Sequence, residues 1–233
     1  SIPANLPSFQ NIDASKKDLD ESSFESLDEF NAMRLQDYSL EHFIASFSKL
    51  KSFENTIFIM LGDHGLANRN PLLINSGISE YSLFINHIPL LIYSPKLIPA
   101  KVDQRSVSQI DVFATAADLA GIAHNNTTLG KSVVSSDFFD KSYAFTYNWQ
   151  NKKTEYKLIY NDLLYHYHDG KEGLYLFKSD DYKTDKQKEN LLLFKEMKDV
   201  AAGFYHSARY IRYHNKPQTL NTKHQTLNNC TNW

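Results

Sequence analysis

The sequence predicts an α/β domain with a mostly parallel sheet flanked by helices, followed by a C-terminal antiparallel meander and a helix. In the first half of the chain, amphipathic helical patterns alternate with short, continuous apolar runs, which are typical of strands covered on both faces. After about residue 125, short aromatic-rich runs replace this pattern. A chain of 233 residues, 42% of them hydrophobic, can bury a substantial core.

The first helix and strand are predicted over residues 26–50 and 56–61. Between residues 26 and 50, apolar side chains recur at steps of three and four, which indicates one face of an amphipathic helix. Asn55 interrupts the pattern, and the run Thr56–Leu61 is continuously apolar after its first residue. The sequence therefore predicts a helix, a tight loop and a buried strand.

A second strand and helix repeat the theme. Residues 88–93 form another apolar run, with Pro89 near its start, where a missing amide is least costly. Ser108 is expected to cap a helix over residues 109–120, and Gly121 occupies the position where a helix often ends.

The second half of the chain predicts an antiparallel meander and a final helix. Asn161-Asp162 is expected to form a two-residue hairpin turn. The strands are expected at residues 143–147, 156–160, 163–168 and 174–177, and the helix at residues 186–213. We expect four segments: a polar loop from a truncated N-terminal half (1–25), the C-terminal half of an α/β core (26–135), the antiparallel strands and terminal helix of the same domain (136–214), and a loose tail (215–233).

The net charge and the cysteine content identify neither a partner nor a redox compartment. The formal net charge of −2 gives no general attraction for nucleic acid, so none is expected as a partner. The single cysteine, Cys230, cannot form an intrachain disulfide, which is compatible with a reducing or an oxidising compartment. No stretch approaches the roughly 18 to 20 apolar residues that a membrane span needs.

The sharpest motif is Gly62-Asp63-His64-Gly65, at the carboxyl end of the first predicted strand. Functional loops of α/β sheets gather at such ends, and the flanking glycines permit a turn that aims both side chains at one point. One carboxylate oxygen and one imidazole nitrogen suit Zn²⁺ or Mn²⁺, whereas Mg²⁺ or Ca²⁺ would need more oxygens. The motif alone is equally compatible with a turn capped by Asp63 and a partly buried histidine.

Other histidines and one acidic residue have simpler interpretations. His166 and His168 share one face of a predicted strand, as a metal pair would, but two solvent-facing histidines are favoured. Asp111 lies in the first turn of its helix, where the helix dipole favours a carboxylate. Surface roles are the default for His42, His206 and His214, and a core role for Tyr205 and Tyr210.

Several short motifs follow one another along the chain: Asp37–Ile44, Asn55–Ile59, Gly62–Gly65, His87-Ile88-Pro89, Gln109–Val112 with Asp118–Ile122, and Leu129–Ser132. Their order resembles that of the sulfatase and alkaline phosphatase superfamily, closest to the lipoteichoic acid synthase-like phosphoglycerol transferases. The resemblance covers residues 29–132 well and the rest loosely, where Glu189-Asn190-Leu191 is similar to a stretch near the family's end. It implies an alkaline phosphatase-like fold, present in part.

The resemblance implies that Asp63 and His64 bind a divalent metal (Mn, Mg, Zn or Ca) and that His87 is catalytic. His87 either ligates a second metal or donates a hydrogen bond to the transferred group; a histidine at a strand entrance, bonded to loop backbone, is equally compatible. The family's nucleophile and first acidic metal ligand belong to its N-terminal half, so the resemblance implies that both lie upstream of this chain. Cys230 is followed by Thr231, Asn232 and Trp233, so the sulfatase pattern Cys-x-Pro-x-Arg does not occur here. The chain alone is therefore expected to be inactive.

These motifs lead to two hypotheses. The first is a metal-dependent enzyme acting on phosphate esters, a phosphoglycerol or phosphoethanolamine-type transferase or a phosphodiesterase, with a sulfatase as the alternative. His87-Ile88-Pro89 favours phosphate esters, because many sulfatases carry Glu-Gly-Gly-x-Arg-Val-Pro there. The substrate would be lipid- or glycan-linked, on the extracytoplasmic side of the cell membrane, with membrane contact only through a missing N-terminal region. The second is a non-catalytic scaffold or binding module, which would have no reason to hold stoichiometric metal.

Overall fold

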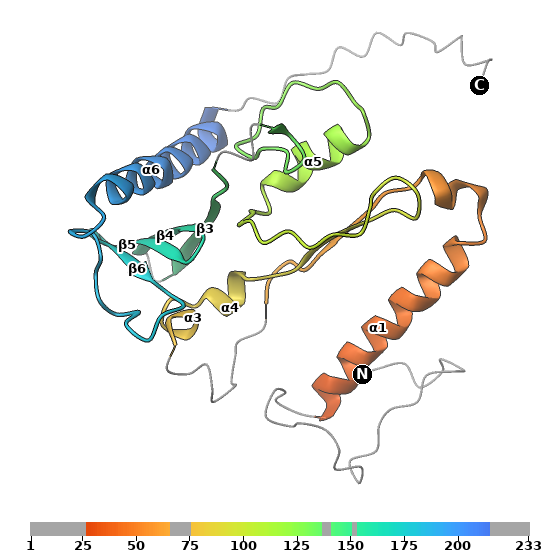
Figure 1. The fold of residues 1–233 in the computed structure, drawn as a ribbon, viewed down its shortest axis with the longest axis horizontal. Coiled ribbons are helices and arrows are strands. Elements are labelled where there is room, and N and C mark those ends of the chain that lie inside the picture. Colours follow the sequence, from red (N-terminus) through yellow and green to blue (C-terminus); the bar gives the residue numbers. More distant parts are fainter. Residues whose placement is uncertain (1–26, 66–75, 137–140, 151–152, 215–233) are drawn as a thin grey trace.

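The computed structural model describes residues 27–65, 76–136, 141–150 and 153–214, and these form a mixed α/β structure (Figure 1). The predicted polar loop and loose tail, residues 1–25 and 215–233, lie outside the described residues. The elements are α1 (Leu27–Phe47), the 3₁₀ helix η2 (Lys51–Asn55), β1 (Phe58–Leu61), α3 (Gly77–Glu80), α4 (Leu83–Asn86), β2 (Leu90–Tyr93), α5 (Asp111–Leu119), β3 (Ala144–Gln150), β4 (Lys153–Tyr160), β5 (Leu163–His168), β6 (Lys171–Leu176) and α6 (Leu191–His214).

The predicted meander is confirmed as a four-stranded antiparallel sheet in the order β3-β4-β5-β6. Asn161 has a φ of 53°, as a tight hairpin turn between β4 and β5 requires. Asp169 and Gly170 also have positive φ angles, of 50° and 87°, and connect β5 to β6. Such an Asp-Gly pair favours a two-residue hairpin turn.

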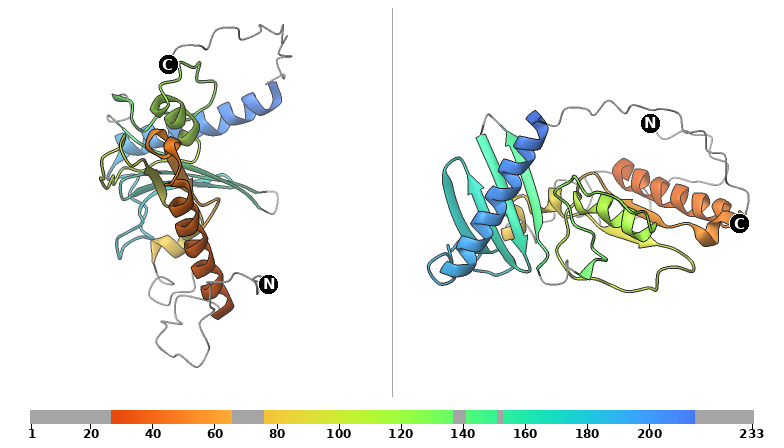
Figure 2. Two further views of the ribbon diagram at one scale, coloured as in Figure 1. Left: turned by 90° about the vertical axis from the view of Figure 1, so that its right-hand side faces the viewer. Right: turned by 90° about the horizontal axis from the view of Figure 1, so that it is seen from above.

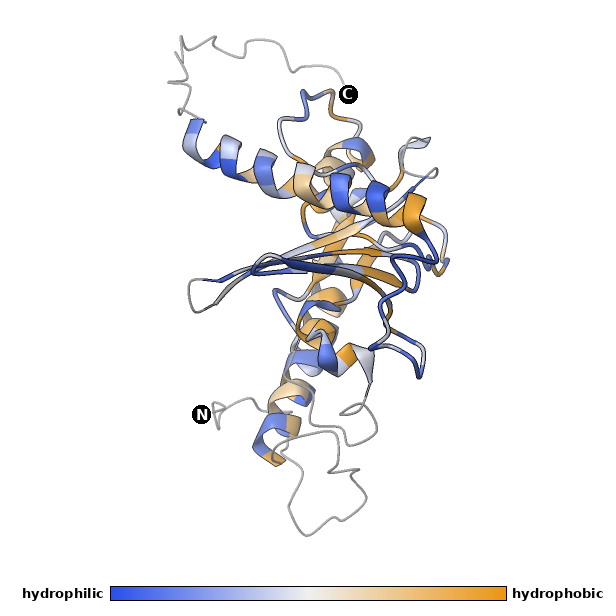
Figure 3. Cartoon of the chain, turned by 90° about the vertical axis from the view of Figure 1, so that its left-hand side faces the viewer, coloured by the Kyte–Doolittle hydropathy of each residue, from blue (hydrophilic) through white to orange (hydrophobic). Residues whose placement is uncertain are grey.

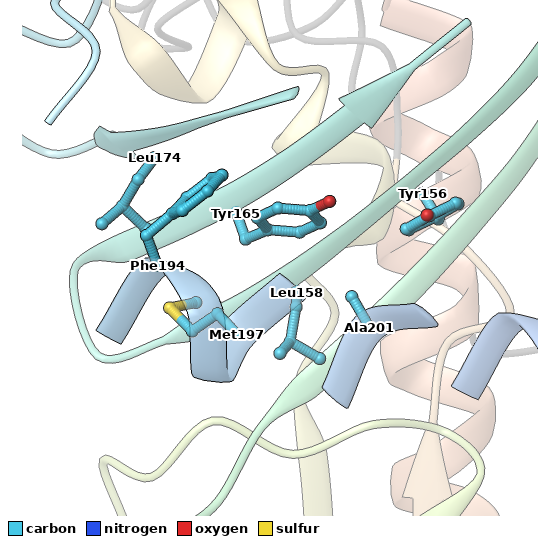
Figure 4. Packing of buried hydrophobic residues seen from close by; sticks show 7 residues of the cluster. All are labelled: Tyr156, Leu158, Tyr165, Leu174, Phe194, Met197 and Ala201. Atoms are coloured by element: carbon cyan, nitrogen blue, oxygen red, sulfur yellow. The ribbon is translucent and has the colours of Figure 1, made fainter. Parts of the chain in front are cut away.

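The largest core lies between this sheet and α6. Side chains alternate along a strand, so every second residue of β4 and β5 faces the helix. Figure 4 shows this cluster, in which Leu158, Leu174, Met197 and Ala201 are fully buried. The helix crosses the strands (Figure 2) and alternates hydrophilic with hydrophobic residues along its length (Figure 3).

The opposite face of the sheet is covered by the short helices α3 and α4. Tyr81 and Leu83 from this helical segment are buried together with Leu164 of β5 and Phe177. The Tyr81 hydroxyl donates a 2.8 Å hydrogen bond to the Tyr182 carbonyl. The sheet is thus packed on both sides, and the segment before β2 is fixed against it.

The strands β1 and β2 pair antiparallel, with Phe58 opposite Tyr93 and Leu61 opposite Leu90. The prediction of a mostly parallel sheet is therefore wrong for the described residues, in which every strand pair is antiparallel. An apolar run indicates a buried strand but contains no information on its direction, which the connection between strands decides.

The apolar side chains of this two-stranded ribbon are also less covered than predicted. Leu61 is 40% exposed and Leu91 is 53% exposed. Helix α1 contacts the beginning of the ribbon, where the Phe47 and Phe58 rings meet edge-on with centroids 5.4 Å apart. Edge-to-face aromatic pairs of this kind contribute beyond the area they bury. None of the described helices is long and apolar enough to cross a membrane.

Met197→Ala should reduce the stability of the protein strongly, because Met197 is fully buried between α6 and the sheet. Removing such a side chain typically costs about 2–5 kcal/mol. The matched control is Leu192→Ala on the same helix, where Leu192 is 86% exposed and a change within about 0.5 kcal/mol is expected. Urea denaturation followed by circular dichroism measures both. Equal losses for the two variants would show that the core is not where the structure places it.

Candidate metal-binding loop

The Asp63 and His64 side chains lie side by side where the chain leaves β1. Asp63 Oδ2 is 3.7 Å from His64 Nε2, and the two side chains are 89% and 64% exposed, respectively. The His64 backbone amide donates to Asp63 Oδ1 at 2.9 Å, which ties the carboxylate to its own loop.

A hydrogen bond determines which imidazole nitrogen of His64 can bind a metal. His64 Nδ1 lies 2.9 Å from the Gly65 carbonyl oxygen. A carbonyl only accepts hydrogen bonds, so in the neutral imidazole Nδ1 carries the proton and Nε2 has the lone pair. Metal-binding histidines commonly donate their other N–H to a backbone carbonyl in this way. The free lone pair therefore belongs to the nitrogen nearest to Asp63.

The end of the loop packs against α4. The Gly65 amide donates to the Ile85 carbonyl at 2.7 Å. A Cβ at position 65 would overlap the Phe84 carbonyl oxygen, so only glycine fits this close approach of two backbones.

The start of the loop is bonded to Gln109, two residues before α5. Gln109 Nε2 donates to the carbonyl oxygens of Gly62, at 3.0 Å, and Asp63, at 2.9 Å. Gln109 begins the motif Gln109–Val112, but its residue type and position predict no role for it. A glutamine just before a helix carries no signal that a distant loop lies within its reach.

The start of α5 is itself held by buried hydrogen bonds. Asp111, 5% exposed, accepts from the backbone amides of Ser108 and Lys131, each at 2.8 Å. Burial raises the pKa of Asp111, although these two bonds work in the opposite direction. The predicted capping role of Ser108 is wrong, because its hydroxyl accepts from the Phe145 amide of β3 at 2.6 Å instead of from an amide of α5. Gly121 ends the helix as predicted, with a φ of 66°.

His87 lies at the end of α4, where its backbone amide donates to the Leu83 carbonyl at 2.7 Å. Its side chain is exposed and lines a cleft of about 1790 Å³, to which Asp63, Gln109 and Tyr147 of β3 also contribute. The structure thus brings His87 and Asp63 to one cleft. His64 contacts Asp63 but is not among the residues that line this cleft.

The donors at the loop fit a divalent metal in part. Asp63 and His64 offer one oxygen and one nitrogen side by side, a set that suits Zn²⁺ or Mn²⁺. Structural and catalytic zinc sites use three or four protein ligands. Within the described ranges, no group of three or more His, Cys, Asp or Glu residues could hold a metal, so Asp63 and His64 are not joined there by a third ligand of these types.

His166 and His168 share one face of β5 as predicted, with ring centroids 6.0 Å apart. His166 is not solvent-facing, however: its side chain is 18% exposed, and Nε2 lies 2.8 Å from Glu155 Oε1. Glu155 also pairs with the buried Lys157 at 3.0 Å. Burial lowers the pKa of His166, with Lys157 and His168 acting in the same direction. His166 therefore belongs to a partly buried network with Glu155 and Lys157, whereas His168 is exposed, as expected.

The other histidines and the two tyrosines for which the sequence predicts surface or core roles lie mostly as expected. His42, His206 and His214 lie on helices α1 and α6 beside tyrosine rings. Tyr205 packs against the core, as predicted. Tyr210 does not, because it is 65% exposed.

The model of the sulfatase family matches residues 8–122, a range that contains Asp63, His64 and His87. This part of the chain is therefore similar to the sulfatase family. Among solved structures, the fold is similar to Ps i-CgsB in complex with k-i-k-neocarrahexaose, with a TM-score of 0.58, 15% identity, and coverage of 92% of this chain and 54% of that chain. It is also similar to BT1596, a 2-O GAG sulfatase, with a TM-score of 0.51, 17% identity, and coverage of 83% and 47%. The chain thus spans about half the length of these structures.

Gly65→Ala should displace the loop after β1, because the added methyl group would overlap the Phe84 carbonyl. Overpacking of this kind typically costs about 1–3 kcal/mol. Gly203→Ala in α6 is the control: its Cβ would meet nothing within 4 Å, and a helical glycine replaced by alanine should gain about 0.5–1 kcal/mol. Denaturant unfolding of both variants measures the difference. A Gly65→Ala protein as stable as the parent would contradict the packing described for this loop.

Proposed function

We propose that this chain carries one part of the active site of a metal-dependent sulfatase-superfamily enzyme, in which Asp63 and His64 are two ligands of a divalent metal. The observation that carries the proposal is the adjacency of their free donor atoms. Asp63 Oδ2 and His64 Nε2 lie 3.7 Å apart on an exposed loop. Hydrogen bonds from other elements hold that loop at both ends.

The residues of this chain would hold the metal, and the remaining catalytic groups would come from outside this chain. A bound divalent metal supplies Lewis acidity that polarises an ester oxygen. Asp63 and His64 provide two of its ligands, and further ligands and the nucleophile are proposed to lie in a segment that the chain does not contain. The half-length coverage of the similar structures supports this division.

The first proposed substrate is a sulfate ester on a glycan. The sulfatase family match and the carbohydrate-complexed structural neighbour support this class. Glycan-linked substrates of this kind would place the enzyme on the extracytoplasmic side of the cell membrane, which is part of the proposal.

The second candidate is a lipid- or glycan-linked phosphate ester, as in phosphoglycerol or phosphoethanolamine transfer. His87-Ile88-Pro89 at the entrance of β2 favours it, because this motif differs from the Arg-Val-Pro of many sulfatases. The exposed His87 side chain lines the same cleft as Asp63, so it could contact a substrate held there.

Asp63→Ala and His64→Ala should each weaken metal binding on the order of 100-fold or more, because partners one contact further from a metal already contribute 10- to 100-fold. The measurement is a Mn²⁺ titration of the ¹⁵N-labelled chain, following the paramagnetic broadening of the Gly62 and Gly65 amides. Circular dichroism should be unchanged, because both side chains are exposed on a loop. Asp180→Ala is the control, since it also removes an exposed carboxylate. Unchanged Mn²⁺ broadening in both site variants would exclude the assignment and favour a scaffold.

His87→Ala, in the catalytically complete enzyme, should lower turnover about 100-fold if His87 donates a hydrogen bond to the transferred group. His87→Gln should then recover part of the rate, and much less if His87 is a ligand. The melting temperature should change little, because the side chain is exposed. Parallel assays with a nitrophenyl sulfate and a bis-nitrophenyl phosphate decide between the two substrate classes. Nearly full activity of His87→Ala with both esters would leave His87 as a residue of the loop before β2.

A further inference from the structure

We infer that Gln109 is a positioning residue for the metal-binding loop, fixing the direction in which the Asp63 side chain leaves the backbone. That this positioning serves metal binding rests on the proposed function. Its structural basis is independent of that function, because it consists of two hydrogen bonds between a side chain and a loop 46 and 47 residues earlier in the chain.

The two bonds hold the peptide groups on either side of Asp63. The Gly62 carbonyl belongs to the planar peptide group before the Asp63 Cα, and the Asp63 carbonyl to the one after it. Gln109 Nε2 donates to the first at 3.0 Å and to the second at 2.9 Å. Fixing both planes restricts the φ and ψ angles of Asp63, and with them the direction of its Cβ.

This restraint matters because the Asp63 side chain has little else to hold it. The side chain is 89% exposed, so packing does not select its direction. Its bond from the His64 amide lies within the loop and moves with it. The positions of the carboxylate and of the following imidazole therefore depend on how the loop backbone is tied to the rest of the fold.

Gln109 is suited to this role because its own backbone is anchored. Its neighbour Ser108 bonds to the Phe145 amide of β3 at 2.6 Å. Two residues further on, the buried Asp111 carboxylate accepts from the Ser108 and Lys131 amides. The Gln109 amide thus reaches the loop from a fixed point on the body of the domain.

The chemistry of the two bonds requires a primary amide of this length. The glutamine –NH₂ group has two N–H donors, one for each carbonyl. Glutamate has nearly the same shape, but its ionised carboxylate only accepts hydrogen bonds and would face two carbonyl oxygens. Gln109→Glu therefore removes the donors while it preserves the size of the side chain.

The test compares Gln109→Glu with Gln104→Glu in the full 233-residue chain. Gln104 is also an exposed glutamine of the segment before α5, so the control adds the same charge nearby. The readout is amide hydrogen exchange at Gly65, whose N–H donates to the Ile85 carbonyl. Loss of two hydrogen bonds should accelerate this exchange on the order of tenfold in Gln109→Glu, with no change in Gln104→Glu. Equal exchange in Gln109→Glu and the parent chain would overturn the inference.

A second arm separates this inference from the proposed function. Mn²⁺ is titrated into the same three proteins, and broadening of the Gly62 amide is followed. Binding to the parent chain that becomes severalfold weaker in Gln109→Glu alone supports both proposals. Faster Gly65 exchange without any Mn²⁺ binding to the parent supports the positioning of the loop and rejects its metal function. Equal Mn²⁺ binding in all three proteins, together with unchanged Gly65 exchange, rejects the positioning role of Gln109 and supports the metal-binding function of the loop.

Discussion

The hydrogen bonds at the start of α5 are the constraint on which the candidate site depends. Three separate parts of the fold meet there: β3 through Ser108, the loop after β1 through Gln109, and the segment around Lys131 through Asp111. The buried Asp111 carboxylate accepts two backbone amides, so its removal would leave those donors without partners in a buried place, which costs more than the bonds themselves contribute. A short stretch before one helix thus connects elements that are distant in sequence.

The second support of the site is the packing of the four-stranded sheet on both faces. The core beneath α6 makes the sheet rigid, and the opposite face holds α3 and α4 through Tyr81 and Leu83. Because α4 supplies the carbonyl that binds the Gly65 amide, the loop is bonded to a segment that the sheet holds in place. By contrast, the β1–β2 ribbon leaves Leu61 and Leu91 largely exposed. The loop after β1, which is the candidate metal-binding loop, is therefore held at both of its ends, whereas the strand from which it emerges is only partly covered.

Local chemistry made much of this structure predictable. The Asn161 turn, the aromatic strands and the helix that follows them were predictable because turn residues and side-chain periodicity act over a few neighbours. The adjacency of Asp63 and His64 was predictable for the same reason. The antiparallel direction of β1 and β2, the bond from Ser108 to β3 and the burial of His166 were not. Each of these depends on which distant residue lies opposite, and one sequence does not specify that directly. Gln109 shows this most clearly, since its partners lie more than forty residues away.

The proposed function requires that a divalent metal binds at Asp63 and His64. The most direct measurement is anomalous X-ray scattering from crystals of the protein grown with Mn²⁺. A peak about 2.0–2.2 Å from a carboxylate oxygen of Asp63 and from Nε2 of His64 is expected for such ligands. A Mn²⁺ peak elsewhere, with Asp63 and His64 unchanged and free of metal at saturating Mn²⁺, would contradict the account.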